Sequence, residues 1–435
     1  MLLYGRKEKH AHEIFLLTFR TNCDIRVKET AGFALGGKCS KIVFEKIRPQ
    51  VRGLRKKRTQ LMSVTLQEVK TKKDLRIFVE FPNKLFGKDP NYVPFLGADE
   101  METFTKEKNP AYGFCETKLF LAYKDGKLAG RIAGLINHAY NEKWNQNAIR
   151  FTRFDFIDDP EVSAALFNAV VQWGKERGFT RIMGPIGFTD MDHEGMLVEG
   201  FDRFNMSITF FNHPYYLEHM ERLGLAKDID WIEFRITVPE QPNARIRRIA
   251  EHQEKKYRLQ RVVYHDRKVL YKEAFEAFAL IDEAFSVLYG TVPLTPEVIK
   301  HAVDGYVPLV KTEYICSVKD EAGKIVGFGA LVPSIAKALK KSGGKLFPFG
   351  IFRLLKALKG KNDTLEMFFV AVDPAYQSKG VPAIIIDTLT EILIQNGVKY
   401  CETGPQLETN GAVHSMWGQF EKEQHKRRRC FAKEI

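Results

Sequence analysis

The sequence predicts an α/β protein with a mixed sheet, in which one structural plan is used twice. From Leu75 onward, short aliphatic runs of strand length alternate with amphipathic runs of helical length. Gly178, Gly224 and Gly397 each follow a helical run, where a residue with free φ is favoured. The order hairpin, strand, helix, strand, helix, strand occurs before residue 239 and again after residue 264.

The first copy opens with a helix and a proline-rich turn, followed by a hairpin around Asp125 and Gly126. Its predicted elements are a helix at 78–86, a turn at 91–95, strands at 118–123, 127–137 and 149–157, a helix at 161–177, a strand at 181–185, a helix at 214–223 and a strand at 230–238.

The second copy repeats this order after a polar, basic segment that we interpret as a linker. Its predicted elements are helices at 275–288 and 296–303, strands at 313–319, 324–332 and 365–372, a helix at 383–395, a strand at 400–404, a helix at 412–424 and a strand at 428–433. We therefore expect domains at 62–238 and 265–435, joined by a linker at 239–264.

The composition favours a cytoplasmic protein. The 435 residues are 44% hydrophobic, enough for two or three packed domains, and no run approaches the length of a membrane span. Six cysteines are scattered without a Cys-x-x-Cys motif, so we expect reduced thiols and no disulfide scaffold.

The net charge of +13 is concentrated at the start of the chain. Residues 1–61 hold 15 Lys/Arg and 5 Asp/Glu, a net charge of +10, which leaves only +3 for the rest. Bulk charge therefore does not support nucleic-acid binding by the folded body. We expect residues 1–61 to be a disordered basic extension, with Met62 as the functional start; a basic targeting arm is the alternative.

The segment after the strand at 365–372 is suited to binding a diphosphate. The chain turns at Asp373 and Pro374, passes through Gln377, Ser378, Lys379 and Gly380, and enters a helix at Val381. A helix start carries unpaired N–H groups and a positive partial charge, and Lys379 adds a full charge.

The run from Leu365 to Tyr400 resembles the acyl-coenzyme A loop of the GNAT N-acyltransferase superfamily, whose motif is Gln/Arg-x-x-Gly-x-Gly/Ala. Pro382 departs from that motif and removes one N–H donor. The resemblance implies two tandem GNAT-like domains, of which the second moves an acyl group from acetyl-CoA or a longer acyl-CoA to an amine. It also implies that the N–H groups of Val370 and Val372 bind the pantetheine and the developing oxyanion.

The same resemblance indicates catalytic candidates. Asn410 and Trp417 occupy places where the superfamily often has Asn and a Tyr that protonates the leaving thiolate. An indole cannot act as that acid, so His414 is the candidate, with a structural histidine as the alternative. Glu366, Glu402 and Glu408 are candidates for the base that deprotonates the amine; we favour Glu408, and a solvated loop acid is the alternative.

The first copy has no such diphosphate loop. Asp158, Asp159 and Glu161 crowd its helix start and would repel a diphosphate. The strings 184–188, 195–202 and 212–216 resemble a bacterial family of double GNAT-like proteins, described as YghO-like. Four residues, Asp190, Asp192, His193 and Glu194, suggest a metal site, but no second histidine lies at ligand spacing. We expect a substrate-facing or solvated loop and no metal.

An insertion at 335–361 points toward lipid. It contains eight Lys/Arg and no acid, and in its helix at 351–359 Arg353, Lys356 and Lys359 recur on one side, with leucines on the other. This pattern is typical of a helix at an anionic membrane surface, and the alternative is an amphipathic helix packed on the core. We expect a small-molecule or lipid-like amine as acceptor and a peripheral position at the inner membrane.

The favoured function is thus an acyl-CoA-dependent N-acyltransferase. Two alternatives stay open. One is a non-catalytic GNAT-fold protein that binds acyl-CoA or lipid or acts as a scaffold, which the loss of the catalytic tyrosine allows. The other resembles the aminoacyl-tRNA-dependent ligases, which also pair two GNAT folds.

Overall fold

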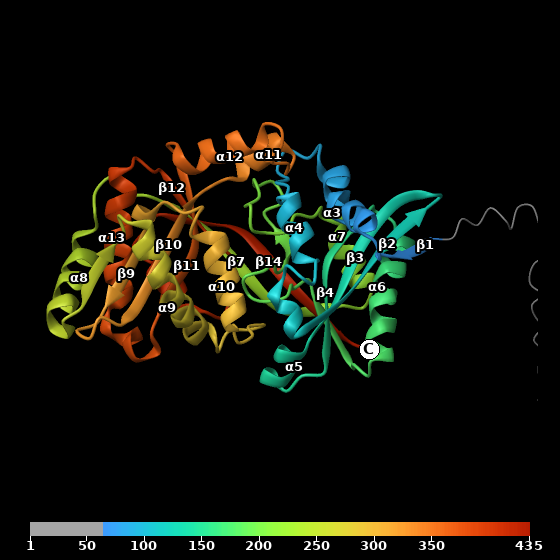
Figure 1. Cartoon of the computed structure of the whole chain (residues 1–435), viewed down its shortest axis with the longest axis horizontal. Helices are drawn as coiled ribbons and strands as arrows, with labels where there is room; N and C mark the ends of the chain where they lie inside the picture. The colour runs from blue at the N-terminus through green and yellow to red at the C-terminus, as the bar shows by residue number, and fades with distance from the viewer. Residues whose placement is uncertain (1–63) are drawn as a thin grey trace, which may run out of the picture. The chain divides into compact units, whose positions relative to one another are not determined.

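A single mixed sheet runs through residues 64–435, the part of the chain that the computed structural model describes (Figure 1). The expected basic extension and the start at Met62 lie outside these residues. The strand order is β1-β2-β3-β4-β5-β14-β7-β12-β11-β10-β9-β8, while β6 pairs with β14 and β13 with β7. The strands are β1 (Thr65–Glu68), β2 (Cys115–Lys124), β3 (Lys127–Asn137), β4 (Ala148–Phe156), β5 (Arg181–Gly184), β6 (Met196–Glu199), β7 (Ala226–Thr237), β8 (Gln260–Val263), β9 (Ile315–Lys319), β10 (Ile325–Pro333), β11 (Thr364–Val372), β12 (Tyr400–Thr403), β13 (Gln406–Leu407) and β14 (Lys422–Glu434).

The two copies pair their strands in the same order. Each copy begins with an antiparallel hairpin, β2 with β3 and β9 with β10, and continues with a strand antiparallel to it. Each then makes one parallel pair, β4 with β5 and β11 with β12. A parallel pair needs a crossover, which α6 (Pro160–Glu176) and α13 (Val381–Gln395) provide.

The last strand of each copy joins the other copy. β7 closes the first copy in sequence but lies beside β12, and β14 closes the second copy but lies beside β5. The two exchanged strands pair with each other from Lys422↔Ile236 to Ala432↔Ala226. The predicted domains at 62–238 and 265–435 are therefore not separate sheets. Strand pattern alone carries no information on which copy a closing strand joins.

Helices cover the second copy on both faces (Figure 1). α8 and α13 pack on one face, and α9, α10 and α12 pack on the other. The remaining helices are α3 (Lys72–Phe86), α4 (Gly97–Thr103), α5 (His138–Trp144), α7 (Tyr215–Arg222), α8 (Ala244–Tyr257), α9 (Arg267–Phe285), α10 (Pro296–Tyr306), α11 (Ala336–Ser342), α12 (Gly350–Lys359) and α14 (Gly411–Met416), with 3-10 turns η1 (Pro110–Gly113), η2 (Thr312–Tyr314) and η3 (Pro374–Lys379).

One segment holds more structure than expected, and one predicted helix is too long. The segment 239–264, expected as a linker, contains α8 and the edge strand β8, and α8 is held to α13 by the ion pair of Arg247 with Asp387. The helix expected at 412–424 ends at Met416, because from Lys422 the chain pairs with β7 as β14. In both cases tertiary pairing overrides a polar, weakly periodic sequence.

A buried ion cluster joins the exchanged strands. Glu233 of β7 is fully buried and pairs with Lys426 (3.3 Å) and Arg428 of β14, which are also buried. Burial alone would raise the pKa of Glu233, but the charges of Arg428 and Lys426 lower it to about 2. The other Arg428 N–H groups bind the loop at 201–212, through Phe210 O (2.6 Å), Asn205 Oδ1 (2.9 Å) and Thr209 Oγ1 (2.9 Å).

Replacing Arg428 should therefore destabilise the fold strongly. We expect Arg428→Met to lower the free energy of unfolding by roughly 3–5 kcal/mol, because it leaves the buried Glu233 carboxylate with Lys426 alone and takes the donor from three buried acceptors. Arg203→Met is the matched control: it also breaks a pair between this loop and β14, with Glu423, but that pair is exposed and should contribute less than about 1 kcal/mol. Urea unfolding measures both; equal losses would contradict the prediction.

Candidate active site

β11 and β12 separate in the middle of the sheet. They pair in parallel from Thr364↔Tyr400 to Met367↔Thr403, and a last bond runs from Gly404 N–H to Met367 O (3.3 Å). β11 then continues alone on this side to Val372, while the chain after β12 turns toward β13 and β7. The sheet thus opens a gap between two strands that began as neighbours.

Backbone donors of β11 face this gap. On the other side of β11, Asp373 N–H donates to Val326 O (3.0 Å) of β10. Because N–H groups alternate in direction along a strand, those of Val372 and Val370 point away from β10 and into the gap. A bulge at Phe368, where Leu331 pairs with Met367 and Ala330 with Phe369, precedes them. Their role as ligands of an acyl donor remains a prediction, and this geometry is compatible with it.

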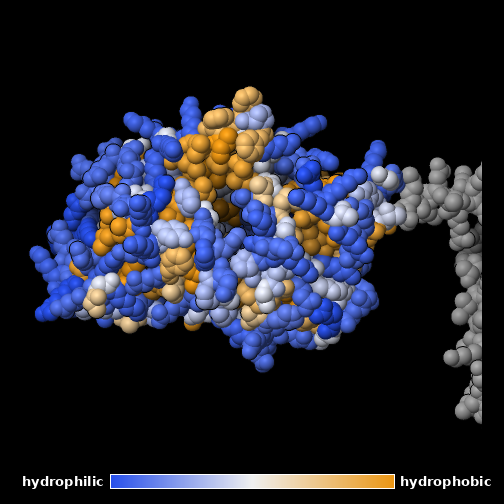
Figure 2. Space-filling view, viewed as in Figure 1, coloured by the Kyte–Doolittle hydropathy of each residue, from blue (hydrophilic) through white to orange (hydrophobic). Residues whose placement is uncertain are grey.

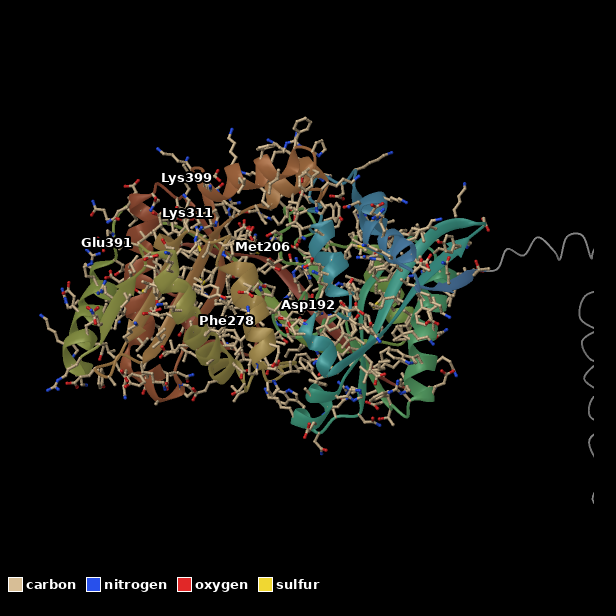
Figure 3. All side chains as sticks on the ribbon, in the orientation of Figure 1. Asp192, Met206, Phe278, Lys311, Glu391 and Lys399 are labelled. Carbon is tan, nitrogen blue, oxygen red and sulfur yellow. The ribbon has the colours of Figure 1, made fainter. Side chains whose placement is uncertain are left out.

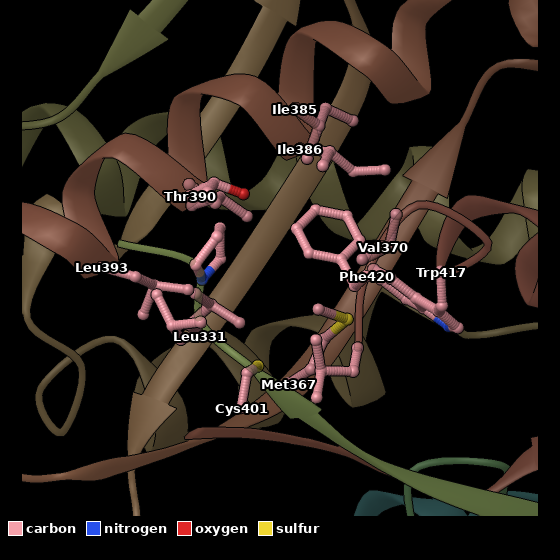
Figure 4. A pocket seen from close by; sticks show the side chains of 14 residues that line it. Leu331, Met367, Val370, Ile385, Ile386, Thr390, Leu393, Cys401, Trp417 and Phe420 are labelled. Carbon is pink, nitrogen blue, oxygen red and sulfur yellow. The ribbon is translucent and has the colours of Figure 1, made fainter. Parts of the chain in front are cut away.

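A narrow apolar cavity lies on the α13 side of the gap (Figure 4). It has a volume of about 470 Å³, including space open to solvent. Aliphatic side chains of α13 form one wall, while Met367, Val370 and Trp417 contribute from the opposite side. Such a lining suits a flexible, weakly polar chain and provides no charge for an ionic group.

A larger cavity lies on the opposite face of β11, between the two copies. It has a volume of about 1160 Å³, also partly open to solvent, and shares Met367 and Val370 with the apolar cavity, so the two meet at the gap. Figure 3 shows Asp192 and Met206 in this central region. Aromatic and aliphatic residues form most of its wall: Ile208, Trp231, Phe285, Leu288, Tyr289, Tyr306, Phe368 and Phe369.

Three carboxylates of the first copy also line the larger cavity: Asp190, Asp192 and Glu194. Asp192 is already neutralised, since Arg153 binds it at 2.7 and 2.9 Å and holds its pKa well below the usual range despite burial. Asp190 and Glu194 have no such partner among the ion pairs of residues 64–435. Burial raises the pKa of Asp190 to about 6 and that of Glu194 well above its usual value.

These acids are not a solvated loop, which was one of the two expectations for them. They are half-buried and line the cavity, and the Oδ1 atom of Asp190 has no hydrogen-bond partner. Residues 64–435 contain no cluster of ligands suited to a metal ion. An unpaired carboxylate in an aromatic cavity favours an ammonium group, which would restore its ionised form.

Glu366 directly precedes Met367, which lines both cavities, but is not itself a lining residue and is only 2% exposed. Its carboxylate accepts hydrogen bonds from Ser207 (3.1 Å) and Ser334 (2.5 Å). Its cross-strand partner Val332 packs in the same cluster as Phe368, which places Glu366 on the cavity face of β11. Burial raises the pKa of Glu366 to about 7, with a further contribution from Glu402 on β12.

The structure places Glu408 differently from what the sequence suggested. Its two oxygens are bound by Lys227 of β7 (2.6 Å) and Arg427 of β14 (3.0 Å). Both of its carboxylate oxygens are therefore already engaged by cations of the protein itself. Burial raises the pKa of Glu366 and of the half-buried Glu402, its partner on β12, so these two acids differ from Glu408; the identity of the base remains a prediction.

The three candidate residues at α14 also differ in whether they line a cavity. Asn410 lines the larger cavity, where its side chain caps α14 by accepting from Val413 N–H (3.3 Å). Neither cavity is lined by His414, which lies against Phe234. Burial and the charge of Lys422 lower the pKa of His414, so the ring is neutral at pH 7 and unsuited to protonate a thiolate. Trp417 lines the apolar cavity and donates to Gln406 Oε1 (3.2 Å).

The predicted diphosphate loop forms a tight corner between η3 and α13. Gly380 has φ +76°, and a Cβ there would lie 2.6 Å from Cγ of Gln253 on α8, so glycine is required for both reasons. Gln377, Ser378 and Lys379 belong to η3, and Val381 begins α13. The Lys379 ammonium lies 4.0 Å from the Tyr376 ring. Diphosphate binding by these residues remains a prediction.

The corresponding gap of the first copy is closed. Ile186 N–H donates to Phe151 O (3.0 Å), so the chain after β5 bridges back to β4. The Tyr216 hydroxyl bonds to Phe156 N–H (3.1 Å) further along β4. Asp159 caps the start of α6 through Glu161 N–H (3.0 Å). Only the second copy offers an open gap, an uncapped helix start and a cavity on each face.

Comparison with known proteins agrees with this geometry. Residues 294–419, which include the gap, the loop and α14, match the Acetyltransferase (GNAT) family model. This part of the chain is therefore similar to GNAT domains.

Two curated proteins resemble the chain beyond the GNAT domain. It is 28% identical over 375 residues to Protein YghO of Escherichia coli (strain K12), which covers 84% of this chain and 94% of YghO. It is 28% identical over 298 residues to the Bacterial ceramide synthase of Caulobacter vibrioides (strain NA1000 / CB15N), which covers 67% of this chain and 76% of that protein.

Solved structures share the fold. A GCN5-related glucosamine N-acetyltransferase region of a fungal multi-domain GH3 beta-N-acetylglucosaminidase superposes with a TM-score of 0.51 at 12% identity, over 86% of this chain and 38% of that one. A tandem GNAT protein from the clavulanic acid biosynthesis pathway gives 0.49 at 10% identity, over 86% and 98%. The prediction of a mixed α/β fold with GNAT-like copies is confirmed.

Sequence reasoning about the GNAT domain missed Ser207 and Gln253. Ser207 is more than 150 residues from Glu366 in the chain, and Gln253 lies in the segment that we took for a linker. No local pattern indicates either contact. The raised pKa of Glu366 likewise depends on burial in the folded chain, which no local pattern indicates.

The raised pKa predicts a pH-dependent stability. The unfolded state is ionised at Glu366 above its ordinary pKa near 4.5, whereas the folded state keeps the proton up to about pH 7. Stability is therefore lost as the pH rises through 7, and Glu366→Gln should remove this loss. We expect the wild type to lose about 1.4 kcal/mol of unfolding free energy relative to Glu366→Gln between pH 6 and pH 8. Urea unfolding at both pH values measures it; a parallel pH dependence would contradict it.

Proposed function

We propose that the protein is an acyl-CoA-dependent N-acyltransferase whose acceptor is a primary amine on a long apolar chain. The observation that carries the proposal is the gap between β11 and β12. It joins a narrow apolar cavity to an aromatic cavity with unpaired carboxylates, and backbone N–H groups face the point where they meet. A thioester and an amine can meet there from opposite faces of the sheet.

The acyl donor would lie along β11. The start of α13 at Gly380 and the Lys379 ammonium suit its diphosphate, and the Val370 and Val372 N–H groups suit its amides and thioester oxygen. The apolar cavity would take the pantetheine arm or part of a long acyl chain.

The acceptor would bind in the larger cavity. Asp190 and Glu194 would attract its ammonium, and the aromatic wall would cover its chain. The similarity to the Bacterial ceramide synthase supports this choice, since a ceramide is the amide of a long-chain amino alcohol. The free amino group of such a molecule is the nucleophile the site requires.

Glu366 would act as the general base. The ionised carboxylate takes a proton from the ammonium through the Ser207 hydroxyl or a water, which leaves a neutral amine. The amine nitrogen then forms a bond to the thioester carbonyl carbon, and the developing oxyanion is bound by β11 N–H groups. The C–S bond breaks, the thiolate leaves, and the second amine proton is released as the amide forms.

The direct test uses the purified full chain with palmitoyl-CoA and a long-chain amino alcohol. We expect one free thiol to be released for each N-acyl amide detected by mass spectrometry. Thermal stabilisation by palmitoyl-CoA without thiol release would instead support the non-catalytic alternative. The absence of both thermal stabilisation and product would overturn the proposal.

Glu366→Gln should lower kcat by about 10²–10⁴, the usual contribution of a positioned base. The wild-type rate should rise with pH and level off above about 7, because only the ionised carboxylate accepts the proton. Glu391→Gln, an exposed acid of α13 paired with Arg247, is the control for loss of one carboxylate. A larger loss of kcat in Glu408→Gln than in Glu366→Gln would contradict this role for Glu366 and would indicate Glu408 as the general base.

Asp190→Asn should weaken acceptor binding specifically. Removing the carboxylate leaves the ammonium in an aromatic cavity with one fewer counter-charge, so we expect KM for the amine to rise about tenfold or more. KM for palmitoyl-CoA should stay within about twofold and serves as the internal control. An increase in both constants would indicate a distorted site and would contradict this role for Asp190.

A further inference from the structure

The insertion at α11 and α12 exposes large aromatic side chains to solvent. Phe347, Phe349 and Phe352 are 78%, 66% and 67% exposed, and Leu355 is 41% exposed. Figure 2 shows an apolar surface at the top of this face, directly above the hollowed centre. Apolar side chains this exposed and this close together mark an interaction surface.

These aromatic residues are not needed to pack the insertion. Leu354 and Leu358 of α12 are buried against the cluster that contains Phe368, and Ala336 and Leu339 of α11 are buried against Val93. The inner faces of α11 and α12 therefore pack on the protein, as the alternative expectation of an amphipathic helix on the core proposed. The outer face remains without an intramolecular partner in the described part of the chain.

Cations surround the exposed aromatic residues. Lys337 pairs with Asp363, and Lys340 donates to the backbone of Asp89. Within residues 64–435, no carboxylate forms an ion pair with the other six cations of the insertion: Lys341, Lys345, Arg353, Lys356, Lys359 and Lys361. An apolar tip within a ring of unpaired cations complements a bilayer with anionic headgroups.

We propose that α11 and α12 dock the protein on an anionic lipid bilayer. Phe347, Phe349 and Phe352 enter the boundary between headgroups and acyl chains, and the six cations bind headgroup phosphates. A second copy of this chain fits less well, because two such surfaces would bring twelve like charges together.

Docking would place the bilayer next to the larger cavity. The buried face of α12 packs in the same cluster as Tyr306, Phe368 and Phe369, which line that cavity. The insertion would then lie between the membrane and the acceptor pocket. This last step rests on the proposed function, since it assigns the bilayer as the source of a long-chain amine; docking itself does not depend on it.

Co-sedimentation with vesicles tests the docking without any catalytic step. We expect the full chain to bind phosphatidylglycerol–phosphatidylcholine vesicles, to bind pure phosphatidylcholine weakly, and to be released by salt. Two triple variants should each weaken partition about tenfold or more: F347S/F349S/F352S and K345Q/K356Q/K359Q. Matched controls are Val287→Ser, an exposed apolar residue elsewhere, and K127Q/K175Q/K268Q, three exposed lysines outside the insertion.

Residues 1–61 carry a net charge of +10 in the wild type and in every variant, so they cannot produce the expected differences. Binding by the insertion variants equal to that of the wild type would overturn the proposal, as would no binding by the wild type. A wild-type dimer that becomes monomeric in F347S/F349S/F352S, with no change in vesicle binding, would assign the surface to a second copy. Docking without thiol release would leave docking supported and the proposed function refuted.

Discussion

The separation of β11 from β12 is the constraint on which the site depends. The N–H groups of a strand inside a sheet normally donate to the neighbouring strands, and a buried N–H group without an acceptor is destabilising. Here Met367 and Gly404 make the last bond across the pair, and the following N–H groups of β11 face a gap. They remain available for a ligand that brings its own acceptors. Both cavities, the bulge at Phe368 and the loop at Gly380 are arranged around this opening.

The two copies differ at equivalent positions of the sheet: the gap is open in the second copy and closed in the first. In the first copy the chain after β5 bonds back to β4, a tyrosine hydroxyl occupies a further N–H group, and Asp159 caps the helix. That copy supplies acids and loop residues to the wall of the larger cavity. The exchanged strands and the buried cluster around Glu233 hold those loops in register with β11. Within residues 64–435, no helix has the length and apolar character needed to cross a membrane.

Local patterns in the sequence predicted most of the elements, and tertiary contacts account for what they missed. The hairpins, the parallel strands and the crossover helices have periodicity or turn residues that act within a few positions. The exchange of β7 and β14 has no local signal, because either strand could close either copy. The glycine and the helix start at Gly380 were predicted from local residues, and Glu408 was favoured as base because it is close to Asn410 in sequence. Glu366 was among the candidates, but its raised pKa arises from burial in the folded chain and from the neighbouring charge of Glu402, neither of which a local pattern indicates.

The central claim is that the open N–H groups of β11 are the ones that hold a thioester donor. Hydrogen exchange of the Val370 and Val372 amides, with and without a non-hydrolysable palmitoyl-CoA analogue, measures this directly. The account predicts that exchange at both positions slows by about tenfold or more with the analogue, together with the amides at Gly380 and Val381, while Phe156 in the first copy is unchanged. Unaltered exchange at Val370 and Val372 in a protein shown to be saturated with the analogue would contradict it.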